Sequence, residues 1–222
     1  MVCNVLVTPA HYSGALNGEA DPILSFCLQY PIFTAHPHLA SVDVLNQFYG
    51  AWSLEVLSQI TTDLTQKALE SYRALAADRQ PNIPFEAAVN YAITYNQNCI
   101  LSLYIDRYEF TGGAHGETIR SSQTWGLGNG QQMELYRFFP HIKDYRAAIL
   151  RFIAAQIAKN PSNYFPDAAD LARQHFKEEN FFLTPQGLGV YFQQYEIAPY
   201  SSGLPVFIIP YYTCNSPQPP LQ

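Results

Sequence analysis

The first candidate site is Thr111–Glu117, with the sequence TGGAHGE. The paired glycines Gly112 and Gly113 allow a sharp backbone turn, which would hold His115 at the rim of a sheet. The segment ends in a carboxylate at Glu117. Because a histidine can donate or accept a proton near neutral pH, His115 is a candidate hydrogen-bonding or acid–base group.

The second candidate site is Tyr195–Gly203, with the sequence YEIAPYSSG, directly after an apolar run typical of a strand. Glu196 can accept hydrogen bonds, and Tyr195 and Tyr200 each offer a stacking face and a hydroxyl. This combination suits the edge of a sugar or a peptide. Since both candidate segments follow predicted strands, we expect them to lie side by side at one end of the sheet and to hold the ligand. Alternatively, the glycines only serve turn geometry and the tyrosines pack as corner residues.

Complete catalytic constellations are missing from the sequence. It has no GxSxG elbow, no GxxxxGK[ST] phosphate loop, no GxGxxG motif and no HExxH helix. If the protein is a hydrolase acting on a polar or glycan substrate, His115 and Glu196 are its candidate acid and base. Glu178 and Glu179 are adjacent, so their side chains diverge, and we interpret them as a solvated helix end.

We expect neither a metal nor a cofactor. His36 and His38 flank a proline without a nearby carboxylate in the sequence, which leaves too few ligands for zinc. Three further histidines are isolated in the sequence, and we interpret them as surface or helix-end residues: His11, His141 and His175. The four cysteines show no CxxC or CxH spacing. We interpret them as buried thiols, with a disulfide only if the protein is exported: Cys3, Cys27, Cys99 and Cys214.

Composition limits the classes of partner. With 12 Lys and Arg against 18 Asp and Glu, the formal net charge is −6, so nucleic acid is an unfavourable partner. No window reaches the ~18 apolar residues that a membrane span needs. The N-terminus lacks the pattern of a secretion signal. We therefore expect a cytoplasmic protein if Met1 is the native start, and an extracytoplasmic one if a leader or membrane anchor was removed.

Hydrophobic periodicity predicts the elements that would position these segments. We expect a helix from Ser41, as N-cap, to about Asp78, with a weak point at Gly50. Pro31 should close the strand before it, and Asn96–Asn98 should form a turn. The predicted strands are 2–7, 23–30, one after Pro84 to about 95, 99–110, 117–125, 133–136, 181–184, 188–194 and 206–211, and further helices are predicted at 140–159 and 167–176.

The pattern predicts an α+β fold without regular βαβ alternation. An antiparallel sheet, made of a meander and C-terminal strands, would pack against a long N-terminal helix and a second helix. We expect one domain over residues 1–215, divided into N-terminal strands and long helix (1–83) and C-terminal sheet and helices (84–215). A disordered tail should follow at 216–222.

Several of these segments also carry a family resemblance. In order, they are YPIF, a long helix, YEFTGGAHGE, GLGNGQQMEL followed by RFF, and GLGVYFQQYEIAPYSSGLPVFIIPY. Over about residues 20–212 the chain resembles the RsiV-like family, the ectodomain of lysozyme-sensing anti-sigma factors. A related module precedes the catalytic domain of the peptidoglycan deacetylase PdaC. The resemblance implies an α+β fold and a role in binding or sensing. It does not extend to a transmembrane helix, a sigma-binding segment or a deacetylase domain.

We therefore expect a non-catalytic binding module of bacterial cell-envelope type. Its ligand would be a lysozyme-like muramidase or a cell-wall glycan. The candidate ligand-binding residues are Gly112, Gly113, His115, Glu117, Tyr195, Glu196 and Tyr200. The alternatives are the hydrolase with His115 and Glu196 and a cytoplasmic interaction or scaffold protein that uses its sheet face in homodimers.

Overall fold

The computed structural model describes residues 3–19, 21–78 and 80–211, and the chain divides into two compact units. The N-terminal unit lies within residues 5–91 and 105–119. The C-terminal unit comprises residues 3–4, 92–104 and 120–211 of the described part. Each unit is presented by itself. Both the expected tail at 216–222 and Cys214 lie outside the described residues.

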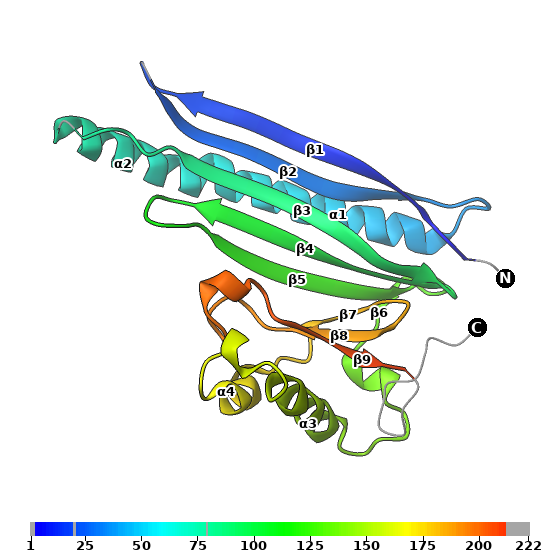
Figure 1. Cartoon of the computed structure of the whole chain (residues 1–222). Helices are drawn as coiled ribbons and strands as arrows, with labels where there is room; N and C mark the ends of the chain where they lie inside the picture. Colours follow the sequence, from blue (N-terminus) through cyan, green and yellow to red (C-terminus); the bar gives the residue numbers. More distant parts are fainter. Residues whose placement is uncertain (1–2, 20, 79, 212–222) are drawn as a thin grey trace. The chain divides into compact units, whose positions relative to one another are not determined.

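The N-terminal unit is a sheet with one long helical segment along one face (Figure 1). Strands β1 (Leu6–Asn17) and β2 (Pro22–Thr34) form an antiparallel hairpin. Strand β3 (Phe85–Gln97) begins in this unit and pairs in parallel with β2. The helical segment between β2 and β3 consists of α1 (Ala40–Gln59), the π-helical turn η1 (Ile60–Leu64) and α2 (Thr65–Ala77).

Buried helix residues recur every three or four positions, so they form the stripe that faces the sheet. They are Val42, Leu45, Tyr49, Ser53, Val56, Ile60, Leu64 and Ala68. Tyr49 packs against Phe33 of β2, with ring centroids 5.6 Å apart. Asn46 accepts from the Phe33 N–H (2.8 Å) and donates to its C=O (2.9 Å). One helix amide thus satisfies both backbone groups of a strand residue beyond the stretch that pairs with β3.

The long helix predicted from periodicity is confirmed, but three local predictions are wrong. Its N-cap is Leu39, and Ser41 is buried inside the first turn. The α-helix continues through Gly50, and the irregularity lies at η1. Pro31 does not end β2, because it lies opposite Pro9 of β1 and beyond the residues that pair with β3. A proline at such a place removes no ladder hydrogen bond.

The meander continues the same sheet, whose strand order is β1-β2-β3-β4-β5-β6. Its remaining strands are β4 (Ile100–Phe110), β5 (Glu117–Gly126) and β6 (Gln131–Gln132). The turn between β3 and β4 has positive φ at Asn98 (53°) and Cys99 (56°). It therefore extends one residue beyond the predicted turn, Asn96–Asn98. The predicted strand at 133–136 is wrong: a 3-10 turn, η2 (Leu135–Phe138), buries Leu135 and Phe138 there.

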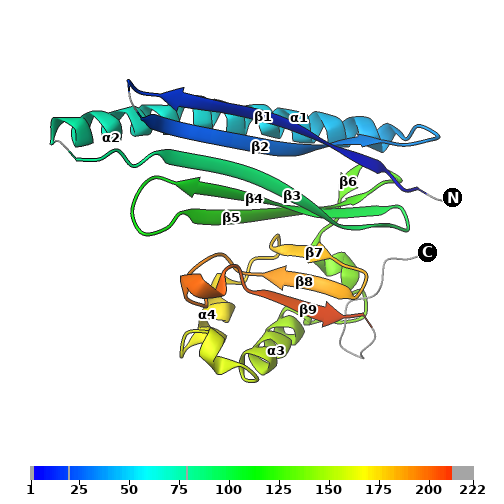
Figure 2. The same ribbon diagram turned by 45° about the horizontal axis from the view of Figure 1, so that its top comes forward.

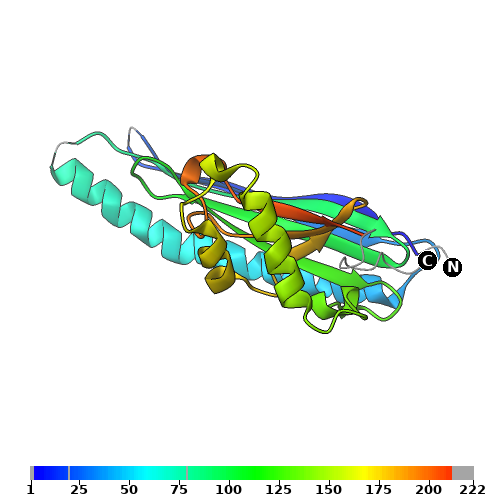
Figure 3. The same ribbon diagram turned by 60° about the horizontal axis from the view of Figure 1, so that its bottom comes forward.

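The C-terminal unit contains a second, three-stranded antiparallel sheet in the order β7-β8-β9. Figures 2 and 3 show two helices on one face of it. Its strands are β7 (Phe181–Leu183), β8 (Gly187–Tyr191) and β9 (Val206–Pro210). The helices are α3 (Tyr145–Ile157) and α4 (Ala168–His175), with short 3-10 turns at η3 (Pro161–Asn163) and η4 (Tyr200–Ser202).

These elements share one apolar core, which includes Ile149 and Ile153 of α3 and Leu188 and Val190 of β8. A buried hydroxyl pair, Ser102 and Thr124 at 2.8 Å, crosses from β4 to β5 within this unit. Ser102 also accepts the Leu183 N–H at 2.9 Å. The two hydroxyls are therefore satisfied, and β7 is held in place by a hydrogen bond as well as by packing.

The interpretation of the cysteines as buried thiols is wrong for those described. Cys3 and Cys99 form a disulfide, although they are 96 positions apart in the sequence. Cys27 is free and exposed. Sequence spacing carries no signal for this pairing, because residues far apart in the sequence become neighbours only in the fold.

The predicted α+β class with antiparallel-dominated sheets is confirmed, including the long N-terminal helix. The parallel pairing of β2 and β3 was not expected, because the helical segment between them makes a β-α-β crossover. Among the described residues, no helix is long and apolar enough to span a membrane.

Close backbone approach makes Gly187 essential for the small sheet. A Cβ at this position would lie 2.2 Å from the Ile209 carbonyl oxygen of β9. We expect Gly187→Ala to lower the free energy of unfolding by about 3 kcal/mol, because the two strands would have to separate. Chemical denaturation measures this loss. Gly128→Ala is the control, since its Cβ would meet nothing within 4 Å. Equal stability of the two variants would contradict the close approach.

Candidate functional site

The strongest candidate site is the segment 193–206 of the C-terminal unit, which we call the corner loop. It begins two residues after β8 and ends at the first residue of β9. Its first turn closes with the Glu196 N–H donating to the Gln193 carbonyl at 3.3 Å. Within this turn Tyr195 has φ = 64°, a left-handed conformation that is uncommon for a residue with a side chain. Such conformations cluster at ligand-binding and active sites.

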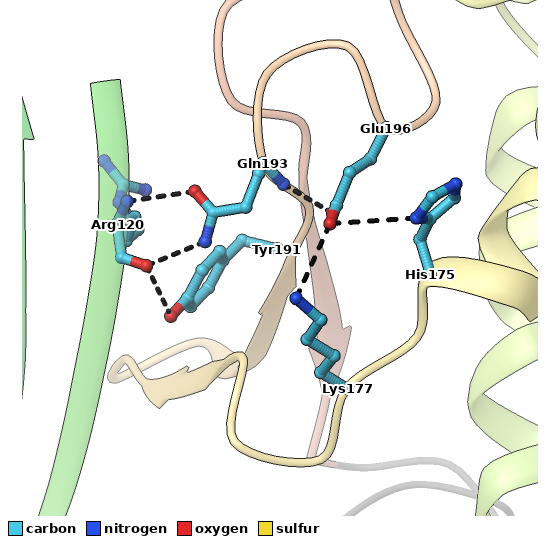
Figure 4. A network of polar contacts seen from close by, with 6 residues as sticks. All are labelled: Arg120, His175, Lys177, Tyr191, Gln193 and Glu196. Carbon is cyan, nitrogen blue, oxygen red and sulfur yellow. Dashed lines mark hydrogen bonds and ion pairs between the residues drawn. The ribbon is translucent and has the colours of Figure 1, made fainter. Parts of the chain in front are cut away.

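Gln193 fixes the start of the corner loop to β5 (Figure 4). Its amide oxygen accepts the Arg120 N–H at 2.9 Å, and its amide nitrogen donates to the Arg120 carbonyl at 2.8 Å. The Arg120 guanidinium lies over the Tyr104 ring, 3.7 Å from its centroid. The side chain of Gln193 thus imitates one rung of a strand ladder and holds the loop on a rigid element.

The Glu196 side chain contacts the start of the corner loop and the end of α4 (Figure 4). Its Oε2 accepts the Gln193 N–H at 2.7 Å. Its Oε1 lies 3.8 Å from Nδ1 of His175, the last residue of α4, and 3.9 Å from Nζ of Lys177, two residues beyond the helix. Only 13% of the Glu196 side chain is exposed. The carboxylate therefore acts as a clamp between the corner loop and α4.

This clamp yields a prediction for stability. Glu196→Ala leaves the Gln193 N–H without its acceptor, and we expect the free energy of unfolding to fall by about 2 kcal/mol. Glu196→Gln keeps an oxygen acceptor and loses only the two long ion-pair contacts, so its cost should stay below about 1 kcal/mol. Urea titrations of both variants make the comparison. An equal loss for Gln and Ala would show that charge, not the hydrogen bond, holds the loop.

The outer side of the corner loop carries an aromatic pair. Tyr195 is 52% exposed, and its ring centroid lies 6.0 Å from that of Tyr200 at an angle of 32°. Tyr200 opens η4, and Gly203 ends that turn with φ = 66°. Tyr200 is half-buried, so the Tyr195 ring is the exposed member of the pair, and it offers a face of the kind on which flat ligands stack.

A polar pocket of about 370 Å³ begins directly after Tyr200. This volume lies within the range of small-ligand sites. Ser202 donates to the Asn163 carbonyl at 2.8 Å, which ties η4 to η3. Burial raises the pKa of the Tyr164 hydroxyl, so this group stays neutral and can donate or accept. The lining residues are Asn163, Tyr164, Ser201, Ser202, Leu204, Pro205 and Val206, none of which is charged.

The TGGAHGE segment lies in the N-terminal unit, between β4 and β5. Gly112 (φ = 96°) and Gly113 (φ = 93°) make the sharp turn. His115 is exposed, and its Nδ1 lies 3.2 Å from the Gly116 carbonyl oxygen. Glu117 is exposed at the first position of β5. This loop therefore presents an imidazole and a carboxylate on a glycine-built turn.

The structure thus groups the seven candidate residues into two sets. Tyr195, Glu196 and Tyr200 are neighbours in the C-terminal unit, whereas Gly112, Gly113, His115 and Glu117 belong to the N-terminal unit. That the two loops share one site stays a prediction. Sequence reasoning missed Gln193, Asn163 and His175, and it described His175 as isolated although it faces Glu196. No local signal marks these three residues.

A second pocket, of about 340 Å³, involves Glu178, which the sequence placed at a solvated helix end. Tyr145 and Arg146 of α3 both donate to its Oε1. The pocket lies between β5, the segment after β6 and the segment before β7. Its lining residues are Ser122, Gln123, Thr124, Gln132, Met133, Glu134, Leu135, Glu178, Glu179 and Phe181.

This ion pair predicts a pH dependence. The hydrogen bond from Arg146 holds the pKa of Glu178 below its ordinary value, and the bond from Tyr145 acts in the same direction while burial opposes both. A lowered folded-state pKa contributes stability above the unfolded value of about 4.3, and this contribution is lost as the pH falls. The stability difference between wild type and Glu178→Gln should therefore be present at pH 7 and shrink progressively as the pH falls below about 4.3. A difference that grows on acidification would contradict the pairing.

The histidine pair in the loop before α1 gains one carboxylate partner, because His38 Nε2 lies 3.0 Å from Asp43 Oδ2. Within residues 3–211, leaving out 20 and 79, no three His, Cys, Asp or Glu side chains are grouped so that they could hold a metal ion.

Two family models match separate parts of the chain. Residues 18–118 match the model described as deacetylase PdaC, and residues 137–212 match the model described as a protein of unknown function, DUF3298. The chain is an α+β protein, and a different one of these two models matches each of its two parts. No curated protein matches it.

Two solved structures are similar over nearly the whole chain. A crystal structure of a DUF3298 family member from Bacteroides fragilis NCTC 9343 has 19% sequence identity and a TM-score of 0.66, covering 93% of this chain and 90% of that one. A DUF3298 family protein from Pseudomonas aeruginosa PAO1 has 16% identity and a TM-score of 0.58, covering 98% and 99%. At these identities the likeness extends to the fold alone.

Proposed function

We propose that this protein is a non-catalytic binding module of bacterial cell-envelope type, and that its corner loop binds a glycan. The observation that carries the proposal is the Tyr195–Tyr200 ring pair, with Tyr195 exposed, in the same loop as residues that line an uncharged polar pocket. Tyr195 keeps a left-handed backbone conformation while half of its side chain remains in solvent. Strained conformations of this kind cluster at ligand-binding sites, and the exposed half of the ring is available to a ligand.

The chemistry of the corner loop fits a sugar better than a charged ligand. Aromatic rings offer apolar faces with hydroxyls at their edges, which suit the C–H faces and hydroxyls of a sugar ring. The pocket adds the hydroxyls of Ser201 and Ser202 and the amide of Asn163. These groups can both donate and accept hydrogen bonds, as sugar hydroxyls and acetamido groups require.

The assignment to the cell envelope rests on two supports. The N-terminal half matches a model named for a deacetylase, and the motifs resemble the RsiV-like family and the module that precedes the PdaC catalytic domain. The Cys3–Cys99 disulfide is typical of an oxidising compartment such as the bacterial periplasm or cell surface. It also favours export over the cytoplasmic scaffold alternative.

The clamp at Glu196 supports a non-catalytic role. A general acid or base needs a carboxyl oxygen that can reach the reacting atom. One oxygen of Glu196 is bound to the Gln193 N–H, and the other faces His175 and Lys177. We infer that Glu196 positions the aromatic pair and does not act on a substrate.

Calorimetric titration with soluble peptidoglycan fragments tests the glycan proposal. We expect saturable binding, so that further fragments added to the saturated protein release no more binding heat. Since sugar sites depend little on charge, the affinity should change only slightly between about 50 and 500 mM salt. A strong fall in affinity with salt would instead indicate that charged groups outside the corner loop carry the binding.

A lysozyme-like muramidase is the second candidate ligand, favoured by the acidic net charge of −6 and by the RsiV-like resemblance. An acidic surface steers a cationic partner, and salt weakens that attraction. A stable complex needs at least about 1,000 Å² of total buried surface, so binding should occlude the enzyme and inhibit it. Titration against a panel of lysozymes at physiological salt tests this. No heat and no inhibition at tens of micromolar would remove the muramidase and leave the glycan.

A further inference from the structure

We propose that β1 is an association edge at which two copies of this chain pair as antiparallel strands, joining their sheets. β1 is 12 residues long and stands at the end of the strand order, so within the described part of the chain no strand pairs with its outer side. A strand edge of this length offers a row of backbone donors and acceptors to another strand. This inference is independent of the glycan proposal.

Native proteins usually protect such an edge with charged residues, and β1 has none. Its sequence, LVTPAHYSGALN, contains no Asp, Glu, Lys or Arg, and neither does the neighbouring β2, PILSFCLQYPIFT. The only protective residue is Pro9, near the start of β1. Two copies can therefore approach edge to edge without bringing like charges together.

The register with β2 reveals which β1 residues face outward. Val7 lies opposite Phe33, but the Phe33 N–H and C=O are bonded to Asn46 of α1 and so are directed away from β1. Val7 and Phe33 are therefore a pair without mutual hydrogen bonds, and the backbone groups of Val7 point to the open side. Pro9 opposite Pro31 agrees, because two prolines cannot exchange hydrogen bonds.

By alternation, His11, Ser13 and Ala15 also direct their N–H and C=O groups outward. An antiparallel pairing centred on Ser13 places Ser13 opposite its own copy and His11 opposite Ala15 of the other copy. All of these residues have N–H donors, so the pairing gains six hydrogen bonds. Pro9 falls opposite Asn17, where the β1–β2 register shifts and the ladder ends. The symmetric register thus avoids the proline, which is what a second copy requires.

The size of the edge predicts a weak dimer. Pairing over residues 9–17 spans about 30 Å at roughly 3.4 Å per residue. With a sheet about 10 Å thick, roughly 600 Å² of total surface is buried, below the range of stable complexes. Association should therefore be concentration-dependent, in the micromolar range or weaker.

Cysteine cross-linking tests the register. In a hydrogen-bonded antiparallel pair the two Cα atoms lie about 5.5 Å apart, which suits a disulfide. We use a Cys27→Ser background, because Cys27 lies opposite Ser13 in the same chain. Ser13→Cys should give a covalent dimer under mild oxidation. Ala15→Cys is the matched control and should not, since its copy lies several residues away along the strand. Equal cross-linking of the two variants would overturn the register.

Sedimentation analysis of the full chain tests the edge itself. We expect a monomer–dimer equilibrium that Ser13→Lys weakens at least 10-fold, because two ammonium groups would face each other. Gln29→Lys, exposed on β2 one strand inward, should leave it unchanged. A chain that stays monomeric up to about 1 mM overturns the proposal. So does a dimer that tolerates Ser13→Lys, which would assign association to another surface. Loss of muramidase binding on Ser13→Lys without any dimer would assign the edge to a different protein.

Discussion

Replacing both Cys3 and Cys99 by serine should lower the free energy of unfolding by about 4 kcal/mol. The disulfide links residues 96 positions apart, and closing a loop of that length removes much of the conformational entropy of the unfolded chain. The cross-link fastens the segment before β1 to the β3–β4 turn, where Cys99 has a left-handed backbone. Thermal and urea unfolding of the double variant measure the loss.

Cys27→Ser provides the control for this variant. Cys27 is free and exposed, so its replacement should change stability by less than about 0.5 kcal/mol. Unfolding of wild type in the presence of a strong reductant should reproduce the double variant. If the double variant and Cys27→Ser were equally stable, the bond would not contribute to the native fold.

Replacing Tyr195 and Tyr200 together by alanine should abolish glycan binding while the fold persists. Stacking of a ligand ring on an aromatic side chain contributes about 1–3 kcal/mol per contact, by analogy with bases on aromatic platforms. Loss of both rings should therefore lower the affinity by at least about 100-fold. Tyr195 is half exposed, so little core packing is lost with it.

Tyr136→Ala is the matched control for the aromatic pair. Tyr136 lies in η2 with 48% exposure, close to the 52% of Tyr195, but outside the corner loop. It should bind glycan as wild type does. An equal loss of affinity in Tyr136→Ala would indicate non-specific adsorption to exposed aromatic residues, and unchanged binding in the double variant would remove the corner loop as the site.

Elements with strong periodicity could be predicted from the sequence alone. The stripe of apolar residues from Val44 to Leu75 predicted the long helix, and alternation at Val89–Tyr95 predicted β3. What failed depended on partners far away in the sequence. The disulfide between Cys3 and Cys99 has no local sequence pattern. Pro31 predicts the end of a strand unless its position opposite Pro9 of the neighbouring strand is known.

For the candidate site, the sequence indicated the residues of the loop but not the role of Glu196. Tyr195, Glu196 and Tyr200 attracted attention because their types and order are unusual after an apolar strand, and they do lie in one loop. The role of Glu196 depends on Gln193, His175 and Lys177. Only Gln193 is close to Glu196 in the sequence; His175 and Lys177 are about 20 residues away. The sequence alone therefore could not distinguish an acid–base role of Glu196 from a structural one.

The most direct test of the central proposal combines binding and chemistry in one experiment. The protein is titrated calorimetrically with a defined, soluble peptidoglycan fragment, and the fragment is recovered afterwards for mass spectrometry. We expect saturable heat and a ligand of unchanged mass. Absence of binding would contradict the glycan ligand. A recovered fragment that has lost an acetyl group or been cleaved would contradict the non-catalytic role and restore the hydrolase with His115 and Glu196 as its candidate acid and base.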